Sequence, residues 1–447
     1  MSELPNGWST ATLDELSGVG GLVSDGDWIE SKDQDPNGSV RLIQLMDVGD
    51  GHFTNRSKRF VNQDTVERLR CTKLRLGDVL IARMPDPLGR ACVFPGVGQD
   101  AITAVDVLIW RAGQISAAPD WLKYAINSPA VREDLALKAG GTTRQRVAGG
   151  VLKRLGLPVP PLAEQRRIVT KLDALTARTA RARADLDRIP ALAERYKQSV
   201  LQTLVPAPAD MSLPLAEVVQ EGLIGLVRSK QQQDEFEGTP YVRMQHYDVD
   251  GVWNDHKLTR VPASSAERAR FALREGDVLF NTRNSAELVG KVAVCTPGQS
   301  GFLYNNNLLR LRFRNDVLPR FAFRQMQGPV FRRHLEGQKS ATTSVAAIYQ
   351  GSLFRTPFWV PSIEVQAEIV NRIDKAFAEI DRLTAEAAAA RRLLDRLDQA
   401  VLAKAFRGKL VSQDPADEPA SVLLDRIRVE RDAAPKAKRG RQTAVPA

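Results

Sequence analysis

The sequence predicts an α+β protein with two similar mixed α/β domains, each followed by a long helix, and an approximate internal twofold symmetry. Three observations predict this fold. The phrase PPLAEQRRIVTKLD at Pro160–Asp173 is echoed 201 residues later as PSIEVQAEIVNRID. Strand and turn motifs upstream of each copy repeat at an offset of about 200 residues, and a helix-like apolar pattern follows each copy. A period of this length is far too long for a solenoid, so it indicates a duplicated domain.

The two globular domains are expected over residues 1–160 and 206–360. Gly77 and Gly276 each precede an Asp-Val-Leu run, the pattern of a turn leading into a strand. A small helix, a turn rich in threonine and glycine, and one or two prolines follow in each half. The expected strands are Val40–Asp47, Val79–Ala82 and Ala91–Phe94, then Tyr241–Gln245, Val278–Asn281 and Lys291–Cys295.

The long helices are expected over residues 161–205 and 361–412. Both segments are rich in alanine, leucine, arginine and glutamate, which favour helix. Apolar residues recur at spacings of three and four, which is typical of a coiled-coil seam. The positions expected to pair the helices are Ile168, Leu172, Leu175, Leu186, Tyr196, Val200, Ile369, Ile373, Ile380, Leu383, Leu394, Leu397 and Val401.

An antiparallel helix pair is the natural geometry, because each helix follows an equivalent domain. At 1.5 Å rise per residue the pair predicts a rod of roughly 60 Å that separates the two domains. Pro190 predicts a kink or a short break near Ile189. The alternative is an ordinary helical hairpin with no measuring role. Residues 413–447 are expected to form a basic, poorly ordered tail.

Composition favours a folded protein with an acidic partner. The chain has 63 lysine and arginine residues against 53 aspartate and glutamate residues, a formal net charge of +10. Nucleic acid is the first partner to consider, although an arginine-rich genome also yields basic proteins. The sequence lacks an apolar run of about 18 residues and a signal peptide, so a cytoplasmic location is expected. Three distant cysteines predict reduced thiols.

Catalytic motifs are missing from the sequence. An adenine methyltransferase needs an Asn/Asp-Pro-Pro-aromatic motif to hold the flipped base, and the chain has none. It also lacks the GxxxxGK[ST] phosphate loop and the HExxH metal motif. The pattern favours a protein that reads a partner over one that catalyses a reaction.

Side chains that could read bases cluster at three equivalent places in each half. Arginine pairs with guanine, and asparagine or glutamine pairs with adenine. Each of them could instead contact a phosphate, which sets register but does not specify sequence. Because the two sets differ, we expect two unlike half-sites and an asymmetric target. The candidates for DNA binding are Gln44, Arg56, Lys58, Arg83, Arg90, Thr143, Arg144 and Arg146, then Arg243, Gln245, His246, Arg283, Asn284, Lys291, Lys339, Thr342, Thr343 and Ser344.

The repeated phrase, the GDVL strands at Gly77 and Gly276, and LAKAFRGKLV at Leu402–Val411 resemble the DNA specificity subunit of Type I restriction-modification systems. The resemblance covers nearly the whole chain. It implies two target recognition domains that read a split site on double-stranded DNA, helices that bind two modification subunits, and restriction subunits in the complex. It also implies that S-adenosylmethionine, ATP and Mg belong to those partners and that this chain is non-catalytic. A specificity subunit for a stand-alone methyltransferase and a coiled-coil scaffold that binds no DNA are the alternatives.

Overall fold

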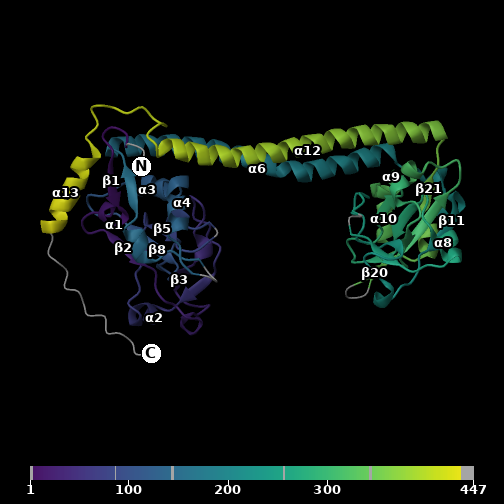
Figure 1. Ribbon diagram of the computed structural model, residues 1–447, viewed down its shortest axis with the longest axis horizontal. Coiled ribbons are helices and arrows are strands. Elements are labelled where there is room, and N and C mark those ends of the chain that lie inside the picture. Colours follow the sequence, from purple (N-terminus) through teal and green to yellow (C-terminus); the bar gives the residue numbers. More distant parts are fainter. Residues whose placement is uncertain (1–3, 86, 142–144, 255–256, 342–344, 434–447) are drawn as a thin grey trace. The chain divides into compact units, whose positions relative to one another are not determined.

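The computed structural model describes residues 4–85, 87–141, 145–254, 257–341 and 345–433. Its contacts divide the chain into two compact units, Met1–Asp185 with Ala390–Ala447, and Leu186–Ala389. Each unit holds one mixed domain and parts of two long helices, α6 (Leu162–Leu204) and α12 (Ile363–Ala405) (Figure 1). The expected α+β class is confirmed.

The first domain is built around a four-stranded antiparallel sheet. Its order is β2, β8, β5 and β6, with bounds Leu22–Asp25, Val107–Arg111, Val79–Ala82 and Ala91–Val93. A second sheet has the order β4, β3 and β7, with bounds Arg59–Val61, Val40–Ile43 and Ala101–Thr103. The chain start and the segment before α6 pair as β1 (Ser9–Thr12) and β9 (Gly156–Val159), which closes the domain beside its helix.

Short helices complete the first domain. α3 (Pro119–Ile126) packs against β5 and β6, and α4 (Pro129–Leu137) follows it. Both helices begin with proline, which suits a first turn because the N–H that it lacks would have no intrahelical partner there. Trp121 of α3 and Trp110 of β8 are fully buried in one core. The other short helices are α1 (Leu13–Leu16), α2 (Gln63–Arg68) and α5 (Gly149–Lys153).

The second domain repeats this topology. Its four-stranded sheet has the order β11, β18, β14 and β16, with bounds Val219–Ile224, Leu308–Phe313, Val278–Asn281 and Val292–Val294. Its three-stranded sheet has the order β13, β12 and β17, with bounds Thr259–Val261, Thr239–Val242 and Leu303–Tyr304. As β3 does, β12 pairs antiparallel with one neighbour and parallel with the other. β10 (Ser212–Pro214) pairs with β21 (Pro357–Trp359). The expected duplication is confirmed.

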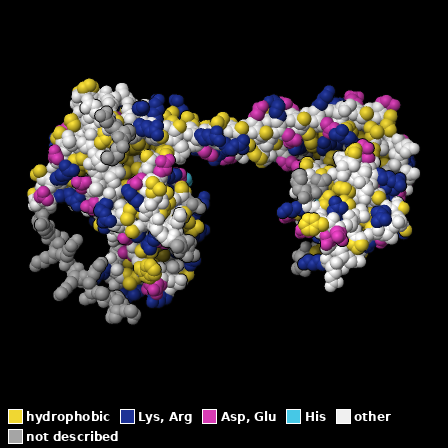
Figure 2. Space-filling model, in the orientation of Figure 1, with side chains coloured by type: hydrophobic (Ala, Val, Ile, Leu, Met, Phe, Trp, Pro, Cys, Tyr) yellow, Lys and Arg dark blue, Asp and Glu magenta, His cyan; other side chains and the backbone are white. Residues whose placement is uncertain are grey.

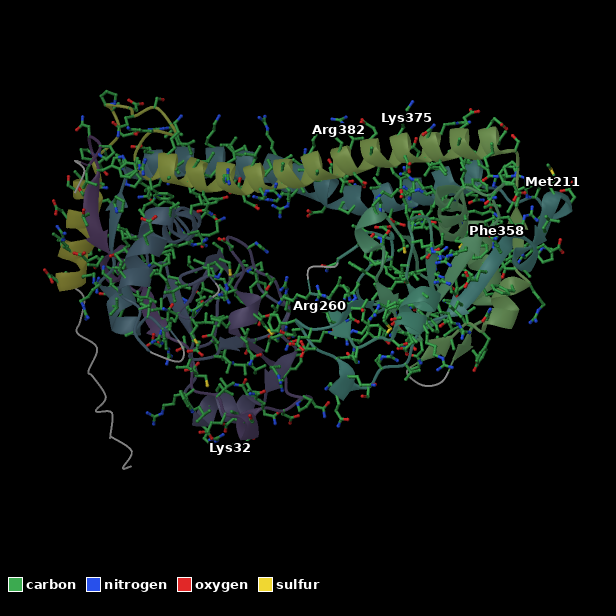
Figure 3. The ribbon with its side chains drawn as sticks, turned by 45° about the vertical axis from the view of Figure 1, so that its right-hand side comes forward. Lys32, Met211, Arg260, Phe358, Lys375 and Arg382 are labelled. Atoms are coloured by element: carbon green, nitrogen blue, oxygen red, sulfur yellow. The ribbon has the colours of Figure 1, made fainter. Side chains whose placement is uncertain are left out.

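The helices of the second domain also match those of the first. α9 (Pro319–Gln327) and α10 (Pro329–Glu336) bury Phe321 and Phe331 in a core that contains Phe358 of β21 (Figure 3). The rings of Phe331 and Phe358 meet edge to face with centroids 6.3 Å apart. The remaining short elements are α7 (Leu215–Val218), α8 (Ser265–Phe271), α11 (Gln350–Phe354), β15 (Arg283–Asn284), β19 (Ser340–Ala341) and β20 (Ala346–Ala347).

One buried ion pair recurs in both main sheets. Arg111 Nε donates to Asp78 Oδ1 at 2.7 Å in the first domain, and Arg312 Nε donates to Asp277 Oδ1 at 2.7 Å in the second. Both aspartates follow the glycine of a GDVL motif, and each also accepts a hydrogen bond from the backbone three residues earlier. The pair therefore fixes the turn before the central strand to its neighbouring strand.

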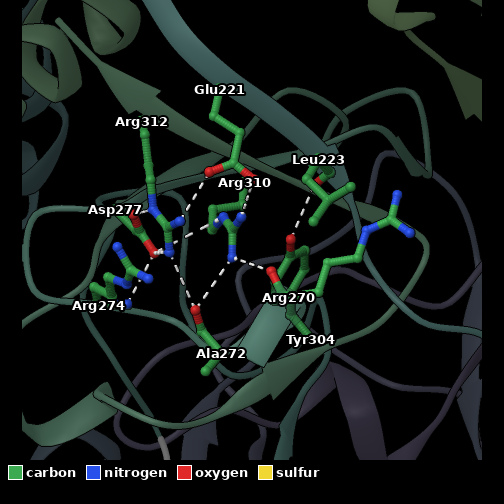
Figure 4. Close-up of polar contacts among 9 residues, drawn as sticks. All are labelled: Glu221, Leu223, Arg270, Ala272, Arg274, Asp277, Tyr304, Arg310 and Arg312. Atoms are coloured by element: carbon green, nitrogen blue, oxygen red, sulfur yellow. Dashed lines mark hydrogen bonds and ion pairs between the residues drawn. The ribbon is translucent and has the colours of Figure 1, made fainter. Parts of the chain in front are cut away.

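The second domain extends this ion pair into a cluster (Figure 4). Arg310 is fully buried and donates to Glu221 Oε1 at 2.6 Å, while Arg312 Nη1 donates to Glu221 Oε2 at 2.8 Å. Burial raises the pKa of Glu221, but the two guanidinium groups outweigh it and hold that pKa below its ordinary value. The first domain has the apolar Ile109 at the position of Arg310.

The long helices run antiparallel within each unit. In the first unit Ile168 shares a core with Ala405, and further along Arg183 pairs with Asp395 at 2.9 Å. In the second unit Lys197 of α6 pairs with Asp381 of α12 at 2.7 Å. As the number rises along α6, the number of its partner on α12 falls in both units.

The positions expected to form the seam differ in burial. Three of its positions are exposed, contrary to the expectation: Tyr196 at 60%, Leu383 at 48% and Leu397 at 48%. Its buried positions are Ile168, Leu172, Ile369, Ile373 and Ile380. Its half-buried positions are Leu175, Leu186, Val200, Leu394 and Val401.

Polar residues one position further along take the inward places. Lys197 is directed at α12 through its ion pair with Asp381. Thr384 and Asp398 are half-buried, and Asp398 pairs with Arg183 at 2.7 Å. Hydrophobicity alone favours Leu383 over Thr384 and Leu397 over Asp398. The expected seam is therefore displaced by one residue at these two positions.

α6 continues through Pro190 without a break. Of the expected kink or short break near Ile189, the break is therefore contradicted. A proline removes only one intrahelical hydrogen bond. The residues on both sides are strong helix formers, and the ion pairs to α12 on either side hold the helix in place.

A buried glutamine joins each domain to its long helix. Gln165 Oε1 accepts from the N–H of Ala118 at 3.2 Å, and Gln366 Oε1 accepts from the N–H of Leu318 at 2.8 Å. Each Nε2 donates to the carbonyl oxygen of a proline just before the helix, at 3.0 and 2.8 Å respectively. Both side chains are fully buried. These two glutamines occupy the same place in the repeated phrase, which explains its repetition.

The segment after residue 413 differs from the expectation of a poorly ordered tail. α13 (Ala420–Ala433) packs against the first domain, where Leu424 and Ile427 are buried in the domain core. Arg431 Nη2 donates to Asp14 Oδ2 at 2.9 Å. The prolines and charged residues of this segment concealed a short apolar stripe at helical spacing. Residues 434–447 lie outside the described residues.

Candidate nucleic-acid interface

In the first domain a turn follows β3 and leads into an exposed loop. The turn closes at the buried Asp47, whose Oδ2 accepts from the N–H of Gln44 at 2.8 Å. Oδ1 of the same carboxylate accepts from the N–H of Ser57 at 2.7 Å. Asp47 thereby fixes the backbone at both ends of the loop. Gln44 is half-buried, and Arg56 and Lys58 are exposed on this fixed backbone.

The equivalent turn of the second domain is closed by a histidine. His246 Nδ1 accepts from the N–H of Arg243 at 3.0 Å, and because a backbone N–H can only donate, Nδ1 carries a lone pair in this bond. Arg243 is half-buried and donates to Thr259 Oγ1 at 3.0 Å. The exposed Gln245 and Phe236 lie with Arg243 around a hollow of about 800 Å³. This hollow offers polar donors beside an apolar ring.

The region after the central strand differs between the domains. Arg83 is buried, its Nη1 lies 2.9 Å from Asp25 Oδ1, and Arg146 pairs with Asp106 at 3.1 Å. Burial lowers the pKa of Arg83, and the Asp25 carboxylate acts in the opposite direction. The second domain has the uncharged Thr282 at the position of Arg83. At this place the first domain groups two arginines with two aspartates, whereas the second has Thr282 followed by the exposed Arg283.

Besides the buried Arg83, whose Nε donates to the carbonyl oxygen of Val147 at 3.0 Å, two more candidate cations are turned into the domains. Arg90 is 8% exposed and donates to the carbonyl oxygen of Val48, while Lys291 is 6% exposed and donates to that of Tyr247. Burial lowers the pKa of Lys291. Both cations face backbone oxygens, and not the surface on which Arg56 lies.

The remaining described candidates belong to the second domain and lie on or beside the small sheet formed by β15, β20 and β19. Arg283 is exposed and Asn284 is half-buried on β15. Lys339 is half-buried, donates to the carbonyl oxygen of Ala286 at 2.8 Å and pairs with Glu336 at 2.5 Å. The candidates Thr143, Arg144, Thr342, Thr343 and Ser344 lie outside the described residues.

Sequence reasoning missed the residues that support these turns. Asp47 was not a candidate, although it occupies the position that His246 has in the second domain. The sequence did contain a signal for these residues. Asp47 lies three residues after Gln44 and His246 lies three residues after Arg243, in each case just after a strand. An exposed phenylalanine, Phe236, was also missed because its segment is otherwise acidic.

The chain carries ten more basic than acidic side chains, which suits a polyanionic partner. On the face in Figure 2, lysine and arginine side chains alternate with acidic ones over each domain. Within the described residues, no group of three potential ligands is placed to hold a metal ion. In the same part of the chain, no helix has the length and apolar character needed to span a bilayer.

Comparison with known proteins agrees with this architecture. Residues 5–190 match the model of the Type I restriction modification DNA specificity domain. The chain is 27% identical over 345 residues to the Type I restriction enzyme EcoKI specificity subunit of Escherichia coli (strain K12), covering 72% of this chain and 74% of that protein. It is 25% identical over 350 residues to the StySPI specificity subunit of Salmonella potsdam, covering 73% and 75% respectively.

Solved structures share the fold. A chain from a study of complex assembly and conformational transition of the type I R-M system aligns with a TM-score of 0.70 at 23% identity, over 92% of this chain and 100% of that chain. The HsdS subunit from Thermoanaerobacter tengcongensis aligns with a TM-score of 0.60 at 23% identity, over 91% and 98% respectively. Together, the duplicated topology and the sequence matches make this chain similar to Type I restriction-modification specificity subunits over most of its length.

Proposed function

We propose that this chain is the sequence-specific DNA-recognition subunit of a Type I restriction-modification complex, reading an asymmetric bipartite site. One observation carries the proposal: two domains of the same topology present equivalent turns with unlike side chains. The first turn offers Gln44, Arg56 and Lys58, and the second offers Arg243 and Gln245. Turns on a rigid scaffold are where groups that read base edges are found.

The two half-sites are expected to differ in sequence. Beyond the turns, the first domain pairs Arg83 with Asp25 and Arg146 with Asp106, whereas the second has Thr282 at the position of Arg83. Different donors and acceptors at equivalent places select different bases. Contacts from Arg56 and Lys58 to phosphates would add affinity without sequence preference.

The long helices are proposed as the spacer between half-sites. In this proposal residues 1–160 and 206–360 are the target recognition domains, and residues 161–205 and 361–412 are the spacer helices. The antiparallel contacts within each unit and the buried Gln165 and Gln366 support a rigid connection. The length of the helices would then set the number of base pairs that are not read.

The partners follow from the family. We propose that the helices dock two modification subunits, which carry S-adenosylmethionine and methylate adenine, and that ATP-dependent restriction subunits with Mg join the complex. In this assembly the chain supplies recognition and its partners supply catalysis. Its place in the cell is then the cytoplasm, where these partners meet the chromosome.

Co-purification and methylation sequencing test the proposal together. The chain is expressed with its own methyltransferase subunit, and the host DNA is sequenced by a method that detects N6-methyladenine. Two methyltransferase chains per copy and methylation in a split, asymmetric motif are the expected results. Recovery of a restriction subunit separates the full complex from a stand-alone methyltransferase. A chain that binds neither DNA nor methyltransferase would be a scaffold, which contradicts the proposal.

A further inference from the structure

Arg90 is a candidate for DNA contact, yet its guanidinium is turned into the first domain. It lies directly before β6 and is 8% exposed. Nε donates to the carbonyl oxygen of Val48 at 2.5 Å, and Nη2 donates to that of Leu45 at 2.8 Å. Nη1 reaches the carbonyl oxygen of Pro87 at 3.2 Å. One side chain therefore ties the turn after β3 to the loop after β5.

Lys291 makes the same connection in the second domain with a different cation. It lies directly before β16, is 6% exposed, and its Nζ donates to the carbonyl oxygen of Tyr247 at 2.7 Å. Tyr247 follows the turn that carries Arg243 and Gln245, as Val48 follows the turn of the first domain. The two domains differ in their surface side chains, yet both have a buried cation at this position. In both, the cation donates to the carbonyl oxygen of the residue that follows the turn.

The loop after each turn is also held to its domain by a separate side-chain hydrogen bond further along the chain. Arg132 Nη2 donates to Asp50 Oδ1 at 2.5 Å in the first domain. In the second domain Gln327 Nε2 donates to the carbonyl oxygen of Asp250 at 2.9 Å. Loss of the buried cation is therefore expected to loosen the turn while the rest of the loop stays attached to the domain.

We infer that Arg90 and Lys291 are positioning residues for base recognition, each fixing the turn of its own domain without touching DNA. The inference rests on the proposed function, because it concerns the half-site that each turn reads. Removing the cation takes the side-chain donor from the carbonyl oxygen of Val48 or of Tyr247, and the turn shifts to satisfy that oxygen. A recognition site that is about 1 Å too loose loses its paired hydrogen bonds. An exposed reader such as Arg56 affects one base pair, whereas a shifted turn affects every base pair it reads.

The full chain, assembled with its methyltransferase subunits, provides the test. The substrates are DNAs in which each base pair of both half-sites is varied in turn. The variants are Arg90→Ala, Arg90→Lys, Lys291→Ala and Lys291→Arg, with Arg56→Ala as a comparison. The readouts are the methylation rate at each sequence, the salt dependence of DNA binding, and the Tm of the chain.

Arg90→Ala is expected to lower discrimination about tenfold at several base pairs of the first half-site, equivalent to about 1.4 kcal/mol. Discrimination at the second half-site and the salt dependence stay as in the wild type. Arg90→Lys restores most of the loss, because lysine makes this connection in the second domain. Lys291→Ala lowers discrimination at the second half-site and leaves the first unchanged. Lys291→Arg restores most of that loss.

Other outcomes overturn the inference. A loss at one base pair that Arg90→Lys does not restore makes Arg90 a base reader. A uniform loss over all sequences with a weaker salt dependence makes it a phosphate contact. A lower Tm with unchanged discrimination leaves it with a structural role alone. A wild-type complex that shows no split sequence preference contradicts the proposed function instead.

Discussion

The hydroxyl of Tyr124 donates a 2.6 Å hydrogen bond to Asp173, and so ties α3 of the first domain to α6. In the second domain Arg324 donates to Asp374 at 2.7 Å, at the equivalent positions. Both aspartates close the repeated phrase. A different donor serves the same acceptor in each half, so the aspartate is the common element of the joint.

Asp374→Ala is expected to destabilise the second unit by about 2 kcal/mol, because it removes charge-assisted hydrogen bonds from Arg324 and Arg320. Urea denaturation of the chain measures this change. The matched control is Lys375→Ala, an exposed neighbour on the outer side of α12 in Figure 3, with a change within about 0.5 kcal/mol. Equal effects from the two variants would contradict the role of the joint.

Asp277→Ala is expected to cost about 3–5 kcal/mol, because it leaves the buried guanidinium of Arg310 and the half-buried one of Arg312 short of a counter-charge. Arg310→Ile, which reproduces Ile109 of the first domain, is expected to be far milder because Arg312 still pairs with both carboxylates. Thermal and urea unfolding compare the two variants. If Arg310→Ile is as damaging as Asp277→Ala, the cluster acts as one unit.

The stability of the second domain is expected to fall with acid partly through Glu221. Its folded pKa is held below the ordinary value, so its contribution is present above the unfolded pKa and is lost as pH falls through the lower folded pKa. The difference in urea midpoint between the wild type and Glu221→Gln should therefore shrink from pH 6 to pH 3. A difference that stays constant over this range would show that the charge of Glu221 does not matter.

Leu424→Ala is expected to cost about 2–5 kcal/mol, because Leu424 is buried in the core of the first domain. Val429 lies on the same helix but is 68% exposed, and Val429→Ala is expected to change stability by less than about 0.5 kcal/mol. Unfolding of the full chain, followed by tryptophan fluorescence, measures both. Equal, small effects would mean that α13 does not belong to the domain core in solution.

Removing one heptad from both α6 and α12 is expected to shorten the spacer and leave both half-sites unchanged. Seven residues correspond to about 10 Å of helix, or about three base pairs. Methylation sequencing of the assembled complex gives the new motif directly. A motif with its original spacing would contradict the measuring role of the helices.

The sequence was sufficient for the mixed α/β class, the duplication, the main strands and the two long helices, because an internal repeat and helical periodicity are visible in the sequence itself. The sequence was not sufficient to predict side-chain directions that depend on contacts with residues far along the chain. Leu383 is the stronger hydrophobe, yet Thr384 lies inward beside it. Arg90 and Arg56 looked alike as candidates, and only the carbonyl oxygens that Arg90 meets inside the fold distinguish them. Side-chain direction is a tertiary property that a single sequence conceals.

The buried Gln165 and Gln366 have a mechanical consequence for the DNA. Each amide bonds both to its domain and to the turn before its helix, which restricts rotation of that domain about the start of its own helix. One extra base pair in the spacer rotates a half-site by about 34°, at about 10.5 base pairs per turn. The double helix would have to absorb that rotation as torsion. Spacing would then be selected through twist energy, and a supercoiled substrate would tolerate different spacings from a relaxed one.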